Sequence, residues 1–475
     1  LSPGDFSFFS KVKVKWNKET YDLELNTTET PNVFKAQIFG LTGVSPERQK
    51  VMFKGSVIKD DEWNPATLKV IKNGATFLMM GSCEELPEVP KDKVVFMEDM
   101  NENELASAMD LPAGLFNLGN TCYLNATIQC LLTVPELCEC LKNHTGTASL
   151  GESFDGSHDI VAALRDVNDK MGNTAAVMPI ILLEMLHIMF PQFAEKGENG
   201  LFAQQDANEC WSELVKVLQQ KLKIKAGDSA ADFIGKYFGG QFVSKMTCKD
   251  NDQEEATTST ESFLQLSCFI SQDVKYLHSG LKSRLEEEIV KQSPTLNRDA
   301  HYLKSSKISR LPAYLTINFV RFFYKEKNAI NAKILKDVKF PMNLDLFDLC
   351  TPELQAKLQP MRQKFKELED SKVERAQKAV EKDAKKTYYP FSFEDDTGSN
   401  NSGLYTLNAV LTHKGRSSSS GHYVGWIKKN DQWFKCDDDK VSPVHVEDVL
   451  KLSGGGDWHC AYVLLYAPQL IEKTE

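Results

Sequence analysis

The sequence lacks a long apolar run. No hydrophobic stretch reaches the ~18–20 residues that a helix needs to span a bilayer. Residues 179–190 are rich in Ile, Leu and Met, but Glu184 and His187 interrupt them, which is typical of a helix in a protein core. We therefore expect no membrane-spanning segment and no membrane partner.

Basic character is also scarce. The chain carries 66 Asp and Glu against 56 Lys and Arg, for a formal net charge of −10 at pH 7, and it contains no strongly basic tract. A surface that binds the phosphate backbone of a nucleic acid needs such a basic tract. We therefore expect no nucleic-acid partner.

The eleven cysteines have neither disulfide nor metal-site spacing. No C-x-x-C pair occurs, and Cys138 and Cys140 stand too close together for a zinc knuckle. Phe residues precede Lys11, the reverse of the charged-then-apolar order of a signal peptide, and an upstream start before Leu1 is left open. These features predict reduced thiols in the cytoplasm, with the nucleus as a second compartment, and no metal or cofactor.

The 475 residues are too many for one hydrophobic core, and their composition divides them. We expect residues 1–10 to be a leader, and residues 11–82 have the strand and helix patterns of a compact unit. Residues 83–110 are acidic and contain prolines, as solvated linkers do. Residues 111–470 form a second domain, in which the charge-dense residues near 351–387 predict an exposed helical insertion.

The second domain is organised around residues 114–132, G-L-F-N-L-G-N-T-C-Y-L-N-A-T-I-Q-C-L-L. Turn-forming residues precede apolar residues at helical spacing, so Cys122 falls in the first turn of a predicted helix. The helix dipole and free N–H groups there stabilise a thiolate. A buried structural cysteine is the alternative for any single Cys. Asn117, five residues upstream, and a His and Asp motif near the C-terminus favour Cys122 as a nucleophile.

That C-terminal motif is a predicted hairpin, with strands near residues 422–427 and 433–439. If its turn is centred between Lys429 and Asn430, His422 lies directly opposite Asp437, with Cβ atoms about 4.5–5.5 Å apart. Asp437 could then accept a hydrogen bond from one imidazole nitrogen and leave the other for a thiol.

Two further residues compete for these roles. Asp438 points to the opposite face of a regular strand, although a bulge would exchange it with Asp437. His459 precedes an apolar strand, and a structural role fits it better than that of a base.

The first domain resembles ubiquitin. Its predicted order is hairpin, helix and strands, and residues 49–55, Q-K-V-M-F-K-G, match the ubiquitin strand that carries the hydrophobic recognition patch. The chain continues past the point where ubiquitin ends, so the resemblance implies a built-in docking module. Met52 and Met79 fall where the patch is expected and are candidate partner-binding residues; core positions are the alternative.

The second domain resembles the ubiquitin-specific proteases. Five boxes carry the resemblance, in the order found in that family: G-L-F-N-L-G-N-T-C-Y at 114–123, Q-Q-D-A-N-E at 204–209, L-P-A-Y-L-T-I-N-F-V-R-F at 311–322, G-H-Y-V at 421–424 and W-F-K-C-D-D-D-K-V at 433–441. The family fold is an α+β papain-like hand of thumb, palm and fingers, here behind a β-grasp ubiquitin-like domain. Cys436 departs from the usual aromatic or aliphatic residue, and the zinc cysteines of the fingers are missing.

The resemblance implies roles for individual residues. Cys122 is the expected nucleophile, His422 the base, Asp437 its orienting carboxylate and Asn117 the oxyanion donor, with Asp438 as a secondary candidate. The residues expected to hold the substrate tail are Gln204, Gln205, Asp206, Glu209, Ser418, Ser419, Gly421 and Tyr423.

We therefore expect a thiol-dependent deubiquitinase that acts on ubiquitin conjugates. By resemblance to proteasome-associated members of the family, the first domain is expected to dock on the proteasome regulatory particle. A ubiquitin-binding adaptor with little turnover is the alternative, against which the intact Cys, His, Asp and Asn set argues. A transferase that passes the thioester to an amine is a second rival, which a product assay would separate.

The loop before His422 is a candidate regulatory element. Residues 417–421 are four consecutive serines followed by Gly421. Their side chains are small and their backbone has ample freedom. Such a loop could cover the path of the ubiquitin tail until a partner favours the open form. An ordinary mobile loop is the alternative.

Overall fold

The computed structural model describes residues 9–59, 62–82, 109–146, 155–197, 200–226, 229–325, 330–375, 387–417, 420–456 and 458–473. The chain divides into two compact units, Leu1–Phe96 and Met97–Glu475. Within the described ranges, no helix combines the length and the apolarity that crossing a membrane requires. The expected linker, residues 83–110, lies almost wholly outside the described residues.

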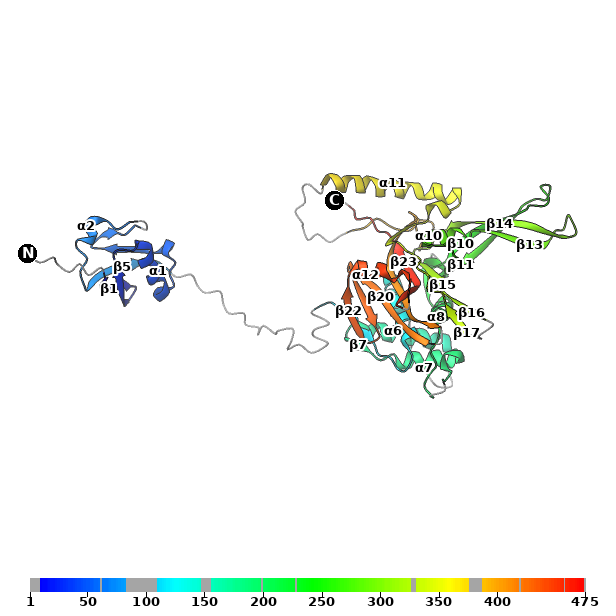
Figure 1. Cartoon of the computed structure of the whole chain (residues 1–475), viewed down its shortest axis with the longest axis horizontal. Helices are drawn as coiled ribbons and strands as arrows, with labels where there is room; N and C mark the ends of the chain where they lie inside the picture. Colours follow the sequence, from blue (N-terminus) through cyan, green and yellow to red (C-terminus); the bar gives the residue numbers. More distant parts are fainter. Residues whose placement is uncertain are drawn as a thin grey trace, which may run out of the picture. The chain divides into compact units, whose positions relative to one another are not determined.

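The first unit is a five-stranded sheet with a helix against it (Figure 1), in the strand order β2-β1-β5-β3-β4. Its elements are β1 (Phe9–Trp16), β2 (Glu19–Asn26), α1 (Pro31–Thr42), η1 (Pro46–Arg48), β3 (Lys50–Phe53), β4 (Ser56–Val57), α2 (Pro65–Leu68) and β5 (Ala75–Met80). Helix α1 starts with Pro31 in its first turn and ends at Gly43, whose φ of 70° is left-handed. Phe34 and Ile38 of this helix pack into the core of the sheet.

The expected recognition patch of this unit needs a correction. Met79 is only 2% exposed and belongs to the core, whereas Leu78 and Met80 on either side of it are 43% and 49% exposed. Met52 is half-buried and pairs with Leu78 across β3 and β5. Side chains alternate along a strand, so an assignment wrong by one residue moves a side chain to the other face. The apolar face consists of Met52, Leu78 and Met80, and Met79 is a core residue.

The second unit begins with helices that form the thumb. These are α4 (Cys122–Leu131), α5 (Pro135–Lys142), α6 (Gly156–Met171), α7 (Ile180–Met189), η3 (Pro191–Ala194), α8 (Ala207–Lys221) and α9 (Phe233–Tyr237), with the short strand pairs β6 (Gly114–Leu115) with β7 (Ala176–Val177) and β8 (Lys223–Ala226) with β9 (Ser229–Asp232).

Two sheets make the rest of the hand. The fingers are a four-stranded sheet ordered β11-β10-β14-β13, and the palm is a ten-stranded sheet with the main order β12-β15-β23-β19-β20-β21-β22. The finger strands are β10 (Gly240–Cys248), β11 (Thr257–Phe263), β13 (Glu286–Gln292) and β14 (Asp299–Arg310). The palm strands are β12 (Leu266–Phe269), β15 (Leu315–Val320), β16 (Phe322–Lys325), β17 (Ile330–Lys333), β18 (Asn343–Asp345), β19 (Leu404–Ser417), β20 (Ser420–Lys429), β21 (Gln432–Asp437), β22 (Lys440–Val444) and β23 (Cys460–Pro468).

Further helices cover the palm: α10 (Leu277–Lys282), η5 (Phe347–Leu349), α11 (Pro352–Arg375), α12 (Val446–Leu450) and η6 (Lys451–Ser453). In Figure 1 the thumb helices lie on one side of the palm, α11 lies on the other, and the finger strands extend away from it. The α+β hand predicted from the sequence is therefore the fold of this unit.

The charged insertion is less exposed than its composition suggests. Helix α11 starts it, and Leu354 and Leu358 in its first turns are buried in the palm core. Arg362 pairs with Asp345 of β18 at 2.7 Å. Two apolar residues one turn apart suffice to seat a charged helix. Residues 376–386 lie outside the described residues.

The fingertip is closed by a carboxylate. The hydroxyls of Ser293, Thr295 and Tyr302 each donate to a carboxylate oxygen of Glu254 at 2.6 Å. Cys248 is the only cysteine in the sequence of the four finger strands. Hydrogen bonds to an ionised carboxylate are stronger than neutral ones, so this network can fix the tip.

A buried arginine joins the palm to its surrounding loops. Arg321, fully buried, donates to the backbone carbonyls of Ala461, Ile334, Lys336 and Ser453 at 2.7–3.0 Å. A buried guanidinium requires such partners. This explains why the arginine of the box at 311–322 is a structural residue and not part of the chemistry.

Candidate active site

The start of α4 places Cys122 under the palm. All ten residues of the helix are buried where it packs against β20 and α8, and the side chains of its polar residues Asn125, Thr127 and Gln129 hydrogen-bond within the protein. Gly119 and Asn120, with φ of 105° and 56°, form a left-handed turn before it. Cys122 itself is 2% exposed.

Three groups face the Cys122 thiol. The side-chain amide of Gln204 donates to Sγ at 3.2 Å, and the backbone N–H of Tyr423 points to it at 3.4 Å. Hydrogen bonds to Asp437 and to the Cys122 thiol raise the pKa of His422 to about 10. The site therefore favours a positively charged imidazole beside the sulfur.

His422 and Asp437 meet as the sequence predicts, but through a different register. The His422 Nε2 and Asp437 Oδ1 atoms are 2.6 Å apart, and the hydrogen bond from His422 holds the pKa of Asp437 well below its usual range. The turn is not at Lys429–Asn430, because Lys429 pairs with Gln432.

The physical reason lies in the two turn residues. Asn430 and Asp431 both have positive φ, 48° and 63°, as the tightest hairpin turns require. This moves the pairing by two residues, so Asp437 lies diagonally from His422 and not directly opposite. A shift of two keeps every side chain on its face, which is why the contact survives.

Asp438 is not an alternative partner for the histidine. It leaves the strand with a φ of 55°, and its two carboxylate oxygens accept from the Asn117 and Asn125 side-chain amides at 2.9 and 2.8 Å. The Asn117 Oδ1 accepts from the backbone N–H groups of Gly119 and Thr121 at 3.0 and 3.1 Å. Hydrogen bonds therefore fix both the oxygen and the nitrogen of the Asn117 side-chain amide. One of its two amide hydrogens is left for another acceptor.

The residues of the box at 204–209 have two roles: Gln204 contacts the Cys122 thiol, and Asp206 caps helix α8, which follows the box. Gln204 and Gln205 are half-buried, and only Gln204 contacts the sulfur. Asp206 caps α8 by accepting from the backbone N–H groups of Asn208 and Glu209, and the Tyr462 hydroxyl donates to it as well. Burial raises the pKa of Asp206. The carboxylate of Asp206 is therefore engaged within the protein, while Glu209 is exposed.

A family model described as ubiquitin carboxyl-terminal hydrolase matches residues 113–466, and one described as the ubiquitin family matches residues 11–83. The chain belongs to the ubiquitin carboxyl-terminal hydrolase family. It is a cysteine-type deubiquitinating enzyme with a ubiquitin-like domain at its N-terminal end.

Relatives of similar length match this hydrolase almost throughout. Ubiquitin carboxyl-terminal hydrolase 14 of Caenorhabditis elegans is 42% identical over 97% of this chain and 94% of its own. Ubiquitin carboxyl-terminal hydrolase 7 of Arabidopsis thaliana is 41% identical over 97% and 99%. Among solved structures, the SAGA DUB module bound to ubiquitin aldehyde has the same fold, with a TM-score of 0.52 and 21% identity over 75% of this chain and 69% of that one.

The hydrolase needs glycine before its histidine. Gly421 has a φ of 141°, and a Cβ there would come within 2.2 Å of the Lys414 carbonyl oxygen and 2.4 Å of His413 Nε2. Tyr423, two residues on, has its side chain in the core and offers only its backbone to the thiol. Ser418 and Ser419 lie outside the described residues, so their expected roles remain predictions.

We expect Gly421→Ala to lower the activity of this hydrolase by at least roughly ten-fold, because a 1 Å misplacement of His422 is enough for such a loss. Turnover of a fluorogenic ubiquitin amide would measure it. Gly456→Ala is the matched control, since a Cβ at Gly456 meets no atom within 4 Å. Equal turnover of Gly421→Ala and the unmodified enzyme would show that the close packing of Gly421 against Lys414 and His413 does not position His422.

The other histidines close to His422 are structural. His459 is 5% exposed, lies 3.2 Å from the Thr412 hydroxyl, and has its pKa lowered to about 4 by burial and by Lys435. Burial also lowers the pKa of His413 to about 3. Among the described residues, His422, Asp437 and Asp438 are the one group whose potential metal-ligand atoms lie within 4.8 Å of one another. Their contacts with each other, Asn117 and Asn125 fit proton transfer and positioning, and we assign no metal to them.

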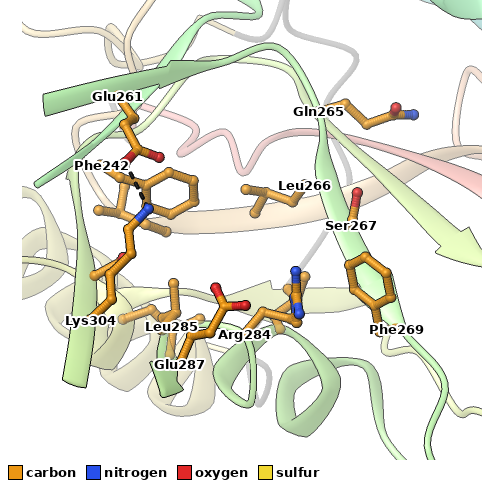
Figure 2. Close-up of a pocket in the computed structure, with 14 residues that line it drawn as sticks. Phe242, Glu261, Gln265, Leu266, Ser267, Phe269, Arg284, Leu285, Glu287 and Lys304 are labelled. Atoms are coloured by element: carbon orange, nitrogen blue, oxygen red, sulfur yellow. Dashed lines mark hydrogen bonds and ion pairs between the residues drawn. The ribbon is translucent and has the colours of Figure 1, made fainter. Parts of the chain in front are cut away.

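A separate cavity of about 340 Å³ lies where the fingers meet the palm (Figure 2). Apolar side chains such as Phe242 and Leu266 form part of its lining, and Lys304 pairs with Glu261 at one edge. Among the described residues, no cysteine or histidine lines it. The cavity is therefore distinct from the thiol site of the hydrolase.

Sequence reasoning missed three contacts of this site. Gln204 was expected only at the substrate tail. Asn125 was not singled out, nor was Lys435, whose Nζ lies 2.7 Å from Asp437 Oδ2. Lys435 carried a usable signal, because residues two apart on a strand share a face. Gln204 and Asn125 reach partners 82 and 313 residues away, for which spacing gives no signal.

Proposed function

We propose that this enzyme cleaves the bond between the C-terminal glycine of ubiquitin and its conjugate through a Cys122 thioester, and that its ubiquitin-like domain docks it on the proteasome regulatory particle. The observation that carries the first part is the convergence of Cys122, His422 and Asp437 in hydrogen-bond contact, which is the arrangement that activates a thiol nucleophile.

The chemistry follows from the placement of these groups. The Cys122 thiolate attacks the glycine carbonyl carbon, and the free amide hydrogen of Asn117, with the Cys122 backbone N–H, stabilises the oxyanion. Protonated His422 gives its proton to the leaving lysine amine, and the C–N bond breaks. Neutral His422 then takes a proton from water, which attacks the thioester and releases ubiquitin and the thiolate. Asp437 holds the imidazole through Nε2, so Nδ1 is left for the sulfur.

The apolar face of the ubiquitin-like domain supports the docking proposal. Leu78 and Met80 are exposed beside half-buried Met52. Two exposed lysines flank them on the neighbouring strands, Lys15 opposite Leu78 and Lys50 opposite Met80. An exposed apolar patch with a charged rim is typical of a protein-binding surface. These two lysines favour a partner segment with apolar residues beside acidic ones.

We expect Leu78→Glu to abolish co-purification with proteasomes, because it places a charge in the centre of the apolar face and beside the acidic groups of the proposed partner. Immunoblotting of affinity-purified proteasomes would measure it, with deletion of residues 1–82 as the reference for full loss. Val33→Glu, a similar change at an exposed apolar residue of α1, is the control and should bind normally. Normal association of Leu78→Glu would refute docking through this face.

A further inference from the structure

Lys435 holds the oxygen of Asp437 that His422 does not use. Its Nζ donates to Asp437 Oδ2 at 2.7 Å, while Oδ1 accepts from His422 Nε2 at 2.6 Å. Lys435 and Asp437 are two residues apart on β21 and therefore share a face. The carboxylate is clamped between an ammonium and an imidazole, one on each oxygen, which fixes its rotation about χ2.

The lysine is itself held in place. Its side chain is 28% exposed, and its Nζ lies 6.0 Å from the ring centroid of Trp426, its cross-strand partner on β20. Trp426 is 6% exposed and donates through Nε1 to the Thr412 hydroxyl at 2.9 Å. An exposed lysine samples many rotamers, but this one is confined between a fixed aromatic face and a carboxylate.

We propose that Lys435 is a positioning residue of the catalytic apparatus, which orients the Asp437 carboxylate toward His422 and, through its charge, limits how strongly His422 retains its proton. The inference rests on the proposed roles of Cys122, His422 and Asp437. A lone carboxylate would stabilise the imidazolium further and make it a poorer acid toward the leaving amine. The ammonium offsets part of that negative charge.

The direction of the expected pH effect follows from the charges around His422. The titratable or charged groups near it are Cys122 from α4, Asp437 and Lys435 from β21, Asp438 from the turn after β21, His413 and Lys414 from β19, and His459 before β23. Of these, Lys435 is the cation bonded to the carboxylate that His422 contacts. Removing its charge favours protonated His422, so the pH at which activity is lost on the alkaline side should rise.

The test compares the full-length enzyme with Lys435→Met, Lys435→Arg and Lys428→Met. Methionine keeps the length of the stem without the charge, and arginine keeps both the charge and a donor. Lys428 belongs to the same hairpin but pairs with Asp431, at 2.8 Å. The measurement is kcat and KM for a fluorogenic ubiquitin amide as a function of pH, with thermal unfolding of each variant to show that it is folded.

We expect Lys435→Met to lower kcat by roughly ten-fold with little change in KM, and to move the alkaline limb of kcat/KM upward by about 0.5–1 pH unit. Lys435→Arg should restore most of both, and Lys428→Met should match the unmodified enzyme. An alkaline limb that does not move in a folded Lys435→Met, or an arginine variant as impaired as the methionine one, would overturn the proposal. Cys122→Ala serves as the separate reference: residual turnover in that variant would refute the proposed function itself.

Discussion

Replacing Cys122 by alanine is expected to abolish hydrolysis of ubiquitin conjugates and to leave ubiquitin binding intact. Removing the nucleophile of a hydrolytic triad lowers kcat by about 10⁵–10⁶. The side chain is small and already surrounded by Gln204, Tyr423 and His422, so its loss leaves the ubiquitin-facing surface unchanged. Turnover of a fluorogenic ubiquitin amide and calorimetric titration with ubiquitin would measure the two effects.

The thiol itself can be located by reaction with ubiquitin that carries an electrophilic C-terminus, followed by peptide mapping. Burial raises the pKa of Cys130 and of Cys210, so neither should compete. Cys140→Ala, at a partly exposed thiol of α5, is the matched control and should be labelled like the unmodified enzyme. Modification at Cys130 or Cys210 would show that the wrong cysteine has been assigned.

Asn117→Ala is expected to lower kcat by roughly 10²–10³ with little change in KM, which is the usual effect of losing one oxyanion donor. The geometry supports this because Gly119, Thr121 and Asp438 fix the amide while leaving one hydrogen free. A donor held before the reaction needs no reorganisation when charge develops on the carbonyl oxygen.

The comparison that isolates this role uses Asn173→Ala. This change removes an amide just after α6 that donates to the carbonyl of Asp169 within the helix. Steady-state kinetics of both variants would be measured at the same pH. If Asn117→Ala changes KM alone, Asn117 binds the ground state of the substrate and does not stabilise the transition state.

Local patterns were sufficient for the elements that carry the site. Turn residues followed by apolar residues at helical spacing placed Cys122 at a helix start, and strand alternation put His422 and Asp437 on one face. Strand alternation repeats every two residues. A register error of two residues therefore leaves each side chain on its predicted face. The hairpin register was wrong by two residues, yet the predicted contact formed.

An error of one residue along a strand, in contrast, changes which face a side chain occupies. Met79 was placed on the binding face when its neighbours Leu78 and Met80 occupy it, because one residue along a strand reverses the face. The anchoring of Asn117 by Asp438 escaped prediction for another reason: it joins a loop to a turn 321 residues away, and neither has a period.

The Glu254 network at the fingertip has a consequence for how the enzyme matures in the cell. Hydrogen bonds from the hydroxyls of Ser293, Thr295 and Tyr302 lower the pKa of Glu254, so this tip is held while the carboxylate is ionised and loosens as acid protonates it. A finger closed by cysteine thiolates must instead acquire a zinc ion after synthesis, and chelation can undo it. The carboxylate and hydroxyls that close this tip belong to the chain itself, so we expect the folding of the tip to be sensitive to acid and insensitive to a zinc chelator.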